Sequence, residues 1–384
     1  MPKVCLLTDT LCDANGVSRF IQDIAKVALS RDCDFSVICP TKKSYCTKAK
    51  NLKIITPLIS FPMPFYHELD LVVPPFLKLY KEIKILQPDI LHIATPGFTG
   101  FVTLMIAKRL KIPVTGTYHT DFPAYIYSNT KSKIAKSITT KYMKYFYGSF
   151  KAIFIRSEVY RDKIKETLGF TDENIFTIPP GIYSERFNPK FRNREYWNTI
   201  GLDAEYKILL YVGRVSKEKN IEFLIELWQT LLNRGVVQSK NLHLILVGSG
   251  KLSEDKVYQK ISNLHFLGHK EGDELSTIYA SSDLFIFPSI TDTLGQVVME
   301  AFSSGLPALV TDKGGPKTIV GDAGLCGFSF SIDKPYLWIE SIETLLQNSK
   351  QLEDMSQNCR DKASRMNIED SFDYFWKQTV SLID

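Results

Sequence analysis

Two short apolar runs, joined by a loop and a helical stretch, stand out in the second half of the chain. Residues 283–287 read Asp-Leu-Phe-Ile-Phe and residues 307–311 read Pro-Ala-Leu-Val-Thr, and both runs are typical of buried parallel strands. Parallel neighbours need a crossover connection. Residues 295–304 are long enough for the crossover helix, and Gly305 favours its end. This stretch therefore predicts a strand–loop–helix–strand unit of an open α/β sheet.

Two carboxylates occupy this unit. Asp292 stands in the loop after the first predicted strand, and Glu300 stands eight positions later, in the predicted helix. Because open α/β sheets bind ligands outside the carboxyl ends of their strands, we expect both carboxylates near a ligand. The free amides at the helix start, around Leu294 and Gly295, favour an anion. Two acids for hydroxyl groups and a helix start for phosphate predict a nucleotide-sugar site.

This stretch resembles the signature of the retaining glycosyltransferases of family 4. Pro-Ser precedes the two acids, and Glu-Ala-Phe-Ser-Ser-Gly-Leu-Pro follows from Glu300 onward. The usual first acid is Glu, whereas this chain has the shorter Asp292. The resemblance implies the GT-B fold, an α/β class in which two Rossmann-like domains with parallel sheets face each other across a cleft. It also implies that Asp292 binds hydroxyls of the donor sugar and Glu300 those of the ribose.

The length of 384 residues favours two domains. We expect residues 1–185 to form the acceptor domain, completed by a crossover helix over residues 369–384, and residues 200–365 to form the donor domain. Strand-like runs alternate with helical stretches up to residue 178, which predicts a parallel sheet. The Pro-rich segments 61–64 and 74–75 predict a surface loop.

The first domain offers candidate residues after two predicted strands. Asn15 and Gly16 follow the strand predicted over residues 3–8, and in the resembling family this loop lies near the donor phosphates and the acceptor. His119 follows the strand predicted over residues 114–118, at the ligand end of the sheet. The family uses a His at this strand end against the donor sugar. Asp121 is a further candidate for the acceptor side.

The second domain offers two cations. Arg214 and Lys219 follow the strand predicted over residues 207–212, where they would face a leaving diphosphate. In the resembling family these two positions hold the donor diphosphate, and the position of Leu267 lies near the nucleotide base. Because side chains can supply the charge that Mg²⁺ gives in other enzymes, we expect no metal and no cofactor. No His/Cys cluster has the spacing of zinc ligands.

Charge is unevenly distributed along the chain. Residues 1–190 contain 27 Lys and Arg against 16 Asp and Glu, a net charge of +11, whereas the remainder has a net charge of −6. Residues 122–157 lack acids altogether and interleave cations with tyrosines. This segment is either a solvated helix face or a surface for an anionic acceptor or an anionic membrane. No recognisable nucleic-acid module accompanies it, so we expect no nucleic-acid partner.

The number and spacing of the cysteines indicate the redox state of the protein's cellular compartment. There are seven, an odd number, without a Cys-x-x-Cys pair, which favours free thiols in a reducing compartment. No apolar run approaches the twenty or so residues of a membrane span. The sequence therefore predicts a cytoplasmic protein, and peripheral attachment to a membrane is the alternative.

These observations and the resemblance together predict retaining hexosyl transfer from a nucleotide-diphosphate sugar to a hydroxyl of a glycan, lipid or glycoprotein. The Tyr-His-Thr-Asp-Phe-Pro stretch from Tyr118 and the Thr-Asp-Thr-Leu-Gly stretch from Thr291 look most like mannosyltransferases, so GDP-mannose is expected ahead of UDP-glucose. Two alternatives remain from other classes. One is a UDP-sugar 2-epimerase, and the other is a sugar-nucleotide-binding protein without catalysis.

Overall fold

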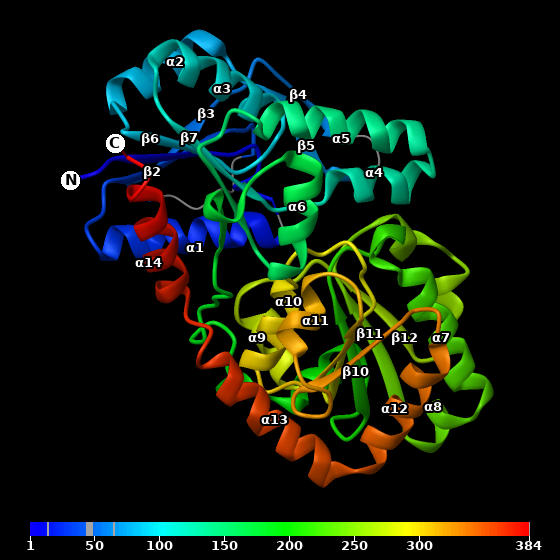
Figure 1. Ribbon diagram of the computed structural model, residues 1–384. Helices are drawn as coiled ribbons and strands as arrows, with labels where there is room; N and C mark the ends of the chain where they lie inside the picture. Colours follow the sequence, from blue (N-terminus) through cyan, green and yellow to red (C-terminus); the bar gives the residue numbers. More distant parts are fainter. Residues whose placement is uncertain (14, 44–48, 64–65, 384) are drawn as a thin grey trace. The chain divides into compact units, whose positions relative to one another are not determined.

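The chain folds into two compact units, each described here by itself. The computed structural model describes residues 1–13, 15–43, 49–63 and 66–383. Unit 1 consists of Met1–Gly181 and Ile368–Asp384, and unit 2 of Ile182–Asn367. Each unit contains a parallel sheet with connecting helices (Figure 1), which confirms the predicted α/β class with two Rossmann-like domains.

Unit 1 is built on a seven-stranded sheet with the order β3-β2-β1-β6-β7-β8-β9, in which neighbouring strands run parallel. The strands are β1 (Val4–Leu7), β2 (Phe35–Pro40), β3 (Leu52–Ile55), β6 (Ile90–Ile93), β7 (Val114–Tyr118), β8 (Ala152–Ile155) and β9 (Ile175–Thr177). The helices are α1 (Gly16–Ser30), α2 (Phe76–Leu86), α3 (Phe98–Leu110), α4 (Phe122–Thr130), α5 (Lys133–Tyr147), α6 (Arg161–Leu168) and α14 (Ile368–Val380). The order reverses between β1 and β6, which makes that pair the topological switch point of this sheet.

The last helix of the chain, α14, completes unit 1. It lies beside α1 (Figure 1), and its Phe372 and Phe375 are buried. Both rings pack edge-on against Phe35 of β2, and Phe375 also packs against His92 of β6, with ring centroids 4.9 Å apart. Unit 1 therefore draws part of its core from residues that follow all of unit 2 in the sequence.

Unit 2 is built on a six-stranded parallel sheet with the order β12-β11-β10-β13-β14-β15. The strands are β10 (Lys207–Val212), β11 (Leu242–Val247), β12 (Leu264–Gly268), β13 (Leu284–Phe287), β14 (Ala308–Thr311) and β15 (Gly327–Phe330). The helices are α7 (Ile221–Asn233), α8 (Val236–Ser239), α9 (Gly272–Ala280), α10 (Gln296–Ser303), α11 (Gly315–Val320), α12 (Pro335–Gln347) and α13 (Ser349–Ala363). The order reverses between β10 and β13, and the strands on either side of that point precede the predicted donor residues.

The expected Pro-rich loop of unit 1 is wrong over most of its length. β4 (Ile59–Met63) and β5 (Tyr66–Val73) form an antiparallel pair of their own, with Phe61 opposite Leu71. Each strand of an isolated pair is an edge strand, and it tolerates proline because about half of its backbone N–H groups point away from the partner strand. Pro64, like Cys46, lies outside the described residues.

The cysteines only partly follow the expectation of free thiols. Cys5, Cys33, Cys39, Cys326 and Cys359 carry free thiols, whereas Cys12 is disulfide-bonded. As for membrane spans, no helix in the part of the chain that the structure describes combines the length and the apolar character needed to cross a bilayer.

Candidate functional site

The candidate donor residues of unit 2 converge at its switch point. β10 and β13 are adjacent and parallel, with Leu209 opposite Leu284, so the loops that follow them emerge at the same edge of the sheet. The first loop carries Arg214 and Lys219, and the second carries Asp292. Crevices of this kind bind ligands in open α/β sheets. The fold therefore brings together residues that lie more than seventy positions apart in the sequence.

The two cations of this crevice are each paired with a carboxylate. Lys219 Nζ lies 2.6 Å from Asp292 Oδ2, and both side chains are largely buried. Arg214 Nη1 donates to Oε1 of Glu218, whose side chain is 3% exposed. The acid expected to bind the sugar thus neutralises a cation expected to bind the diphosphate. Glu218 was missed by the sequence analysis, although it stands four positions after Arg214, a spacing that favours ion pairs.

Asp292 is held in its charged form. Burial by itself raises the pKa of this carboxyl, but the adjacent charge and hydrogen bond of Lys219, with a further contribution from Arg214, bring the pKa below its usual value. The carboxylate is therefore ionised at neutral pH. An ionised acid can accept hydrogen bonds from hydroxyl groups once a ligand separates it from Lys219.

Glu300 lies in α10, the helix that begins at this crevice. It is 6% exposed, and Oε2 accepts a hydrogen bond of 3.0 Å from the hydroxyl of Tyr279 in α9. The sequence analysis did not single out Tyr279, because its distance from Glu300 depends on how α9 packs against α10. The carboxylate is thus held in one orientation by a donor on a neighbouring helix.

The start of α10 is packed tightly against the start of α11. Gly295 has a φ of +91°, and a Cβ there would meet Pro316 Cγ at 3.0 Å. The N–H of Gly315 donates to the carbonyl of Asp292 at 2.9 Å, and a Cβ at Gly315 would lie 2.3 Å from the Thr293 carbonyl. Glycine is required at both positions, one for its backbone conformation and the other for the close approach of two backbones.

Two further predicted donor residues have less distinctive surroundings. Leu294, just before the start of α10, is buried in the hydrophobic core of unit 2. Leu267 lies on β12, at the edge of the sheet, and is only partly buried. These surroundings neither support nor contradict the donor-binding roles predicted for Leu294 and Leu267, which stay predictions.

His119 of unit 1 follows β7 and lies beside Phe20 of α1, with ring centroids 6.1 Å apart. Burial, together with the positive charge of Arg156 and with His92, lowers the pKa of His119 well below its usual value. The imidazole is therefore neutral at physiological pH. Its catalytic role stays a prediction.

Asp121 and Asn15 both cap helices. Asp121 Oδ1 accepts hydrogen bonds from the N–H of Ala124 in α4 and from the Tyr118 hydroxyl, and Oδ2 is ion-paired with Lys163. Asn15 Oδ1 accepts from the N–H of Ser18, and Gly16 is the first residue of α1. These contacts account for the residues structurally, and their predicted place on the acceptor side remains untested.

A carboxylate at the switch point of unit 1 was also missed. Asp9 follows β1 and accepts hydrogen bonds from the Thr95 hydroxyl at 3.0 Å and from the Thr99 N–H at 3.3 Å. Burial raises the pKa of Asp9 to about 6, and the hydrogen bonds offset only part of this effect. Its position directly after the first predicted strand was the available signal in the sequence.

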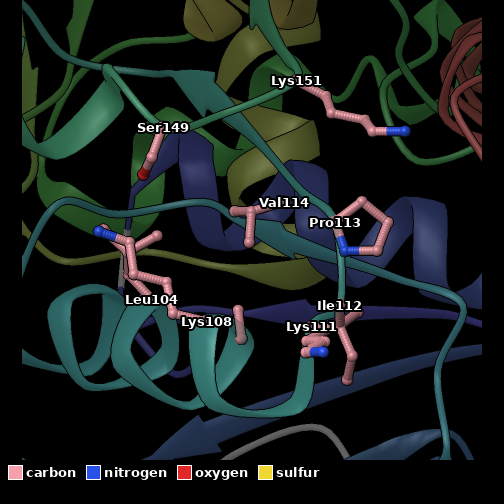
Figure 2. A pocket seen from close by; sticks show the side chains of 9 residues that line it. Leu104, Lys108, Lys111, Ile112, Pro113, Val114, Ser149 and Lys151 are labelled. Carbon is pink, nitrogen blue, oxygen red and sulfur yellow. The ribbon is translucent and has the colours of Figure 1, made fainter.

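A surface pocket of unit 1 is lined by none of these residues (Figure 2). It is lined by Leu104 and Lys108 of α3, by Val114 at the amino end of β7 and by Lys151 just before β8. Ligands of open α/β sheets bind at the opposite, carboxyl end of the strands. As for metals, no group of three or more His, Cys, Asp or Glu residues with the geometry of a metal site occurs within the described ranges. Metal independence nevertheless stays a prediction.

Comparison with known proteins shows which family the chain matches. Residues 14–186 match glycosyltransferase family 4, and residues 193–362 match the glycosyl transferases group 1. The chain is 31% identical over 331 residues to a sulfoquinovosyl transferase of Arabidopsis thaliana; the match covers 84% of this chain and 61% of that protein. It is 26% identical over 329 residues to a GDP-mannose-dependent alpha-mannosyltransferase of Corynebacterium glutamicum, covering 83% of this chain and 75% of that protein.

Solved structures agree at the level of the fold. The crystal structure of HepE from Anabaena in complex with UDP aligns with a TM-score of 0.75 at 16% identity, covering 99% of this chain and all of that one. The matches to both family domains, in the order in which they occur here, confirm the GT-B architecture that the sequence predicted. The chain belongs to the glycosyltransferases that combine a family 4 domain with a group 1 domain on the GT-B fold.

Proposed function

We propose that this chain transfers a hexose from a nucleotide-diphosphate sugar to a hydroxyl of an acceptor, with retention at the anomeric carbon. The observation that supports this best is the crevice of unit 2, where the Arg214–Glu218 and Lys219–Asp292 pairs meet at the switch point. The two cations, Arg214 and Lys219, match the charge of a diphosphate. The carboxylates of Asp292 and Glu300 match hydroxyl groups.

Donor binding would exchange the partners of these four side chains. The diphosphate takes the place of the carboxylates beside Arg214 and Lys219, and the first turn of α10 adds its partial positive charge. Asp292, separated from Lys219, then accepts hydrogen bonds from the sugar. Glu300 accepts them from the ribose, with Tyr279 keeping its carboxylate in place.

The bond to the sugar then breaks without a covalent enzyme intermediate. The anomeric carbon–oxygen bond opens, and its electron pair passes to the diphosphate, whose growing charge Arg214 and Lys219 stabilise. The acceptor oxygen bonds to the anomeric carbon on the same face and loses its proton to the departing phosphate oxygen. The two cations supply the positive charge, so transfer would need no metal.

We propose GDP-mannose as the donor, ahead of UDP-glucose. The support is the GDP-mannose dependence of the corynebacterial relative and the stretches from Tyr118 and Thr291 named above. Titration calorimetry with GDP-mannose, GDP, UDP-glucose and UDP distinguishes the two donors. Arg214→Ala should weaken donor binding measurably, whereas Arg234→Ala, which removes a surface partner of Glu343, should leave it unchanged. Heat from the uridine pair alone would reverse the choice of donor.

One assay separates transfer from the other classes. The full chain is incubated with donor alone and then with donor plus candidate acceptor hydroxyls, and nucleotide and sugar products are identified. A glycosyltransferase forms a new glycoside and releases nucleoside diphosphate. A 2-epimerase changes the sugar without an acceptor, and a binding protein retains the donor unchanged. Either of the last two results would overturn the proposed function.

We also propose that unit 1 contacts an anionic membrane peripherally through α5. Ile134, Ile138 and Tyr145 of this helix are 74%, 64% and 67% exposed, and their spacing places them on one side of it. Exposed lysines flank them: Lys133, Lys136, Lys141 and Lys144. Exposed apolar side chains among cations, in a segment without acids, suit the interface of a bilayer that contains anionic lipid.

Vesicle co-sedimentation tests this contact. The full chain should sediment with vesicles of phosphatidylcholine plus phosphatidylglycerol and much less with phosphatidylcholine alone. The double variant Ile134→Ser/Ile138→Ser should lose most of the binding. The control Leu77→Ser/Ile85→Ser removes equally exposed apolar side chains from α2 and should keep it. Equal losses in both variants, or no preference for anionic vesicles, would contradict the role of α5.

A further inference from the structure

Arg156 and His119 occupy neighbouring positions at the carboxyl end of the unit 1 sheet. β7 and β8 are paired in parallel with Tyr118 opposite Ile155, so the next residue on each strand is His119 and Arg156, respectively. The ring of Phe20 from α1 touches both: the Arg156 guanidinium lies 3.7 Å from its centroid, and the His119 ring meets it edge-on. We call His119, Arg156 and Phe20 the His119 cluster.

Within the described part of the chain, the two terminal nitrogens of the Arg156 guanidinium are buried without hydrogen-bond partners. The residue is 3% exposed, and among the described residues neither Nη1 nor Nη2 has a hydrogen-bond partner. Burial lowers the pKa of Arg156 to about 9, so the group still carries its charge at neutral pH. A buried, charged donor that lacks acceptors is strongly unfavourable, and native structures rarely contain one without a ligand or solvent to satisfy it.

Stacking on Phe20 does not remove this cost. The attraction between a cation and an aromatic ring is weaker than the penalty for leaving buried charged donors unsatisfied. The guanidinium carbon lies over the ring of Phe20, which holds the side chain in place, and Nη1 and Nη2 remain available to donate to another group. A planar fork of N–H donors matches the oxygens of a phosphate.

A second feature beside Arg156 also favours an anion. α1 begins at Gly16, four positions before Phe20, and runs for 15 residues to Ser30. The amino end of a helix carries a partial positive charge and free amides. His119 adds no charge of its own, because its imidazole is neutral. The one full charge identified in the cluster is therefore the positive charge of Arg156.

We propose that Arg156, with the first turn of α1, forms an oxyanion site that binds a phosphate group of a substrate. The proposal rests on the proposed function and deepens it. The resemblance already implied that the loop at Asn15 and Gly16 lies near the donor phosphates, and the new element is the role of Arg156 as the cation that binds a phosphate. The phosphate belongs either to the acceptor or to the nucleotide sugar. The chemistry at Arg156 is the same in both cases.

Thermal unfolding of the full chain, at constant ionic strength, tests whether Arg156 serves a ligand or the fold. In phosphate-free buffer Arg156→Met should leave the melting temperature unchanged or raise it, because it replaces an unsatisfied buried charge by an apolar chain of similar length. Inorganic phosphate should raise the melting temperature of the wild type but much less that of this variant. The control is Arg109→Met, which removes an exposed arginine from above the ring of Tyr80.

Calorimetry identifies the source of the phosphate. In the Arg214→Ala/Lys219→Ala background, which removes the cations of unit 2, glycerol 3-phosphate should still bind and glycerol should not. Adding Arg156→Met should weaken that binding at least about 10-fold, as expected for the loss of charged hydrogen bonds. If Arg156→Met alone weakens GDP or UDP by a similar factor, the phosphate is the nucleotide's; if it weakens only glycerol 3-phosphate, the phosphate is the acceptor's.

Two results would overturn the oxyanion site. One is a lower melting temperature of Arg156→Met in phosphate-free buffer together with an undiminished response to phosphate, which would make Arg156 a structural partner of Phe20. The other is unchanged binding of every phosphate probe by the variant. Failure of the proposed function looks different, because no glycoside would then form from donor plus acceptor while the binding of phosphate and glycerol 3-phosphate still depended on Arg156.

Discussion

Asp9 should make the stability of the protein depend on pH in a way that a single substitution removes. Its pKa is raised from 3.8 to about 6, chiefly by burial. The folded state therefore binds a proton more tightly than the unfolded state does. The stabilisation from this proton is fully present below pH 4 and is lost as the pH rises through about 6.

The magnitude follows from the two pKa values. A pKa that rises from 3.8 to about 6 corresponds to about 3 kcal/mol at neutral pH, and the partial exposure of Asp9 reduces this to about 1–3 kcal/mol. Asp9→Asn keeps the shape of the side chain and has no charge to bury. Its carbonyl can still accept from the Thr99 N–H, and its amide can donate to the Thr95 hydroxyl.

Urea unfolding of wild type and Asp9→Asn between pH 4 and pH 8 measures this effect. The variant should have about the same free energy of unfolding at pH 4 and exceed the wild type by about 1–3 kcal/mol at pH 7. Asp34→Asn, at an exposed position after α1, should show no such pH-dependent gain. A gain for Asp9→Asn that is equal at pH 4 and pH 7 would refute the raised pKa.

Three further predictions concern the donor site of unit 2. Glu300→Ala should weaken nucleotide sugar and free nucleoside diphosphate alike, by about 1.5–3 kcal/mol in titration calorimetry, because the ribose is present in both; unchanged affinity for the free nucleotide would exclude the ribose contact. Arg214→Ala and Lys219→Ala should lower kcat more than they raise KM in steady-state assays, since charge on the diphosphate grows in the transition state, and an effect on KM alone would indicate uniform binding. Transfer should survive EDTA in the same assay, and activity that returns only with Mg²⁺ or Mn²⁺ would show that the two cations do not replace a metal.

The strands of both sheets were predictable because a short local apolar pattern is enough to indicate a buried strand. The strands predicted over residues 114–118 and 207–212 have the bounds of β7 and β10, since short apolar stretches between turn residues have few alternatives to a buried strand. The helix α4 was not expected, because Phe122-Pro123 follows a strand directly and Pro reads as a turn residue there. In the structure this proline occupies the first turn of the helix, where no backbone donor is needed.

The partners of the site residues were less predictable than the residues themselves. Lys219 and Asp292 were recognised separately, but their ion pair spans 73 positions and exists only because β10 and β13 are neighbours. Arg156 was read as one cation in a basic segment. The burial of Arg156 and the absence of partners for Nη1 and Nη2 among the described residues depend on α1 and on the other side chains around it. A local sequence pattern does not predict such tertiary surroundings.

The order in which the chain leaves the ribosome has a consequence for unit 1. Its residues up to Gly181 are made first, yet α14, which supplies Phe372 and Phe375 to the core, follows only after the 186 residues of Ile182–Asn367. At 5–20 residues per second, translation of unit 2 takes about 10–40 s. During that time Phe35 and His92 lack the packing partners that α14 supplies, whereas unit 2 needs no later segment. The first half of the nascent chain is thus the part most in need of a chaperone, and unit 2 is expected to reach its native state before unit 1.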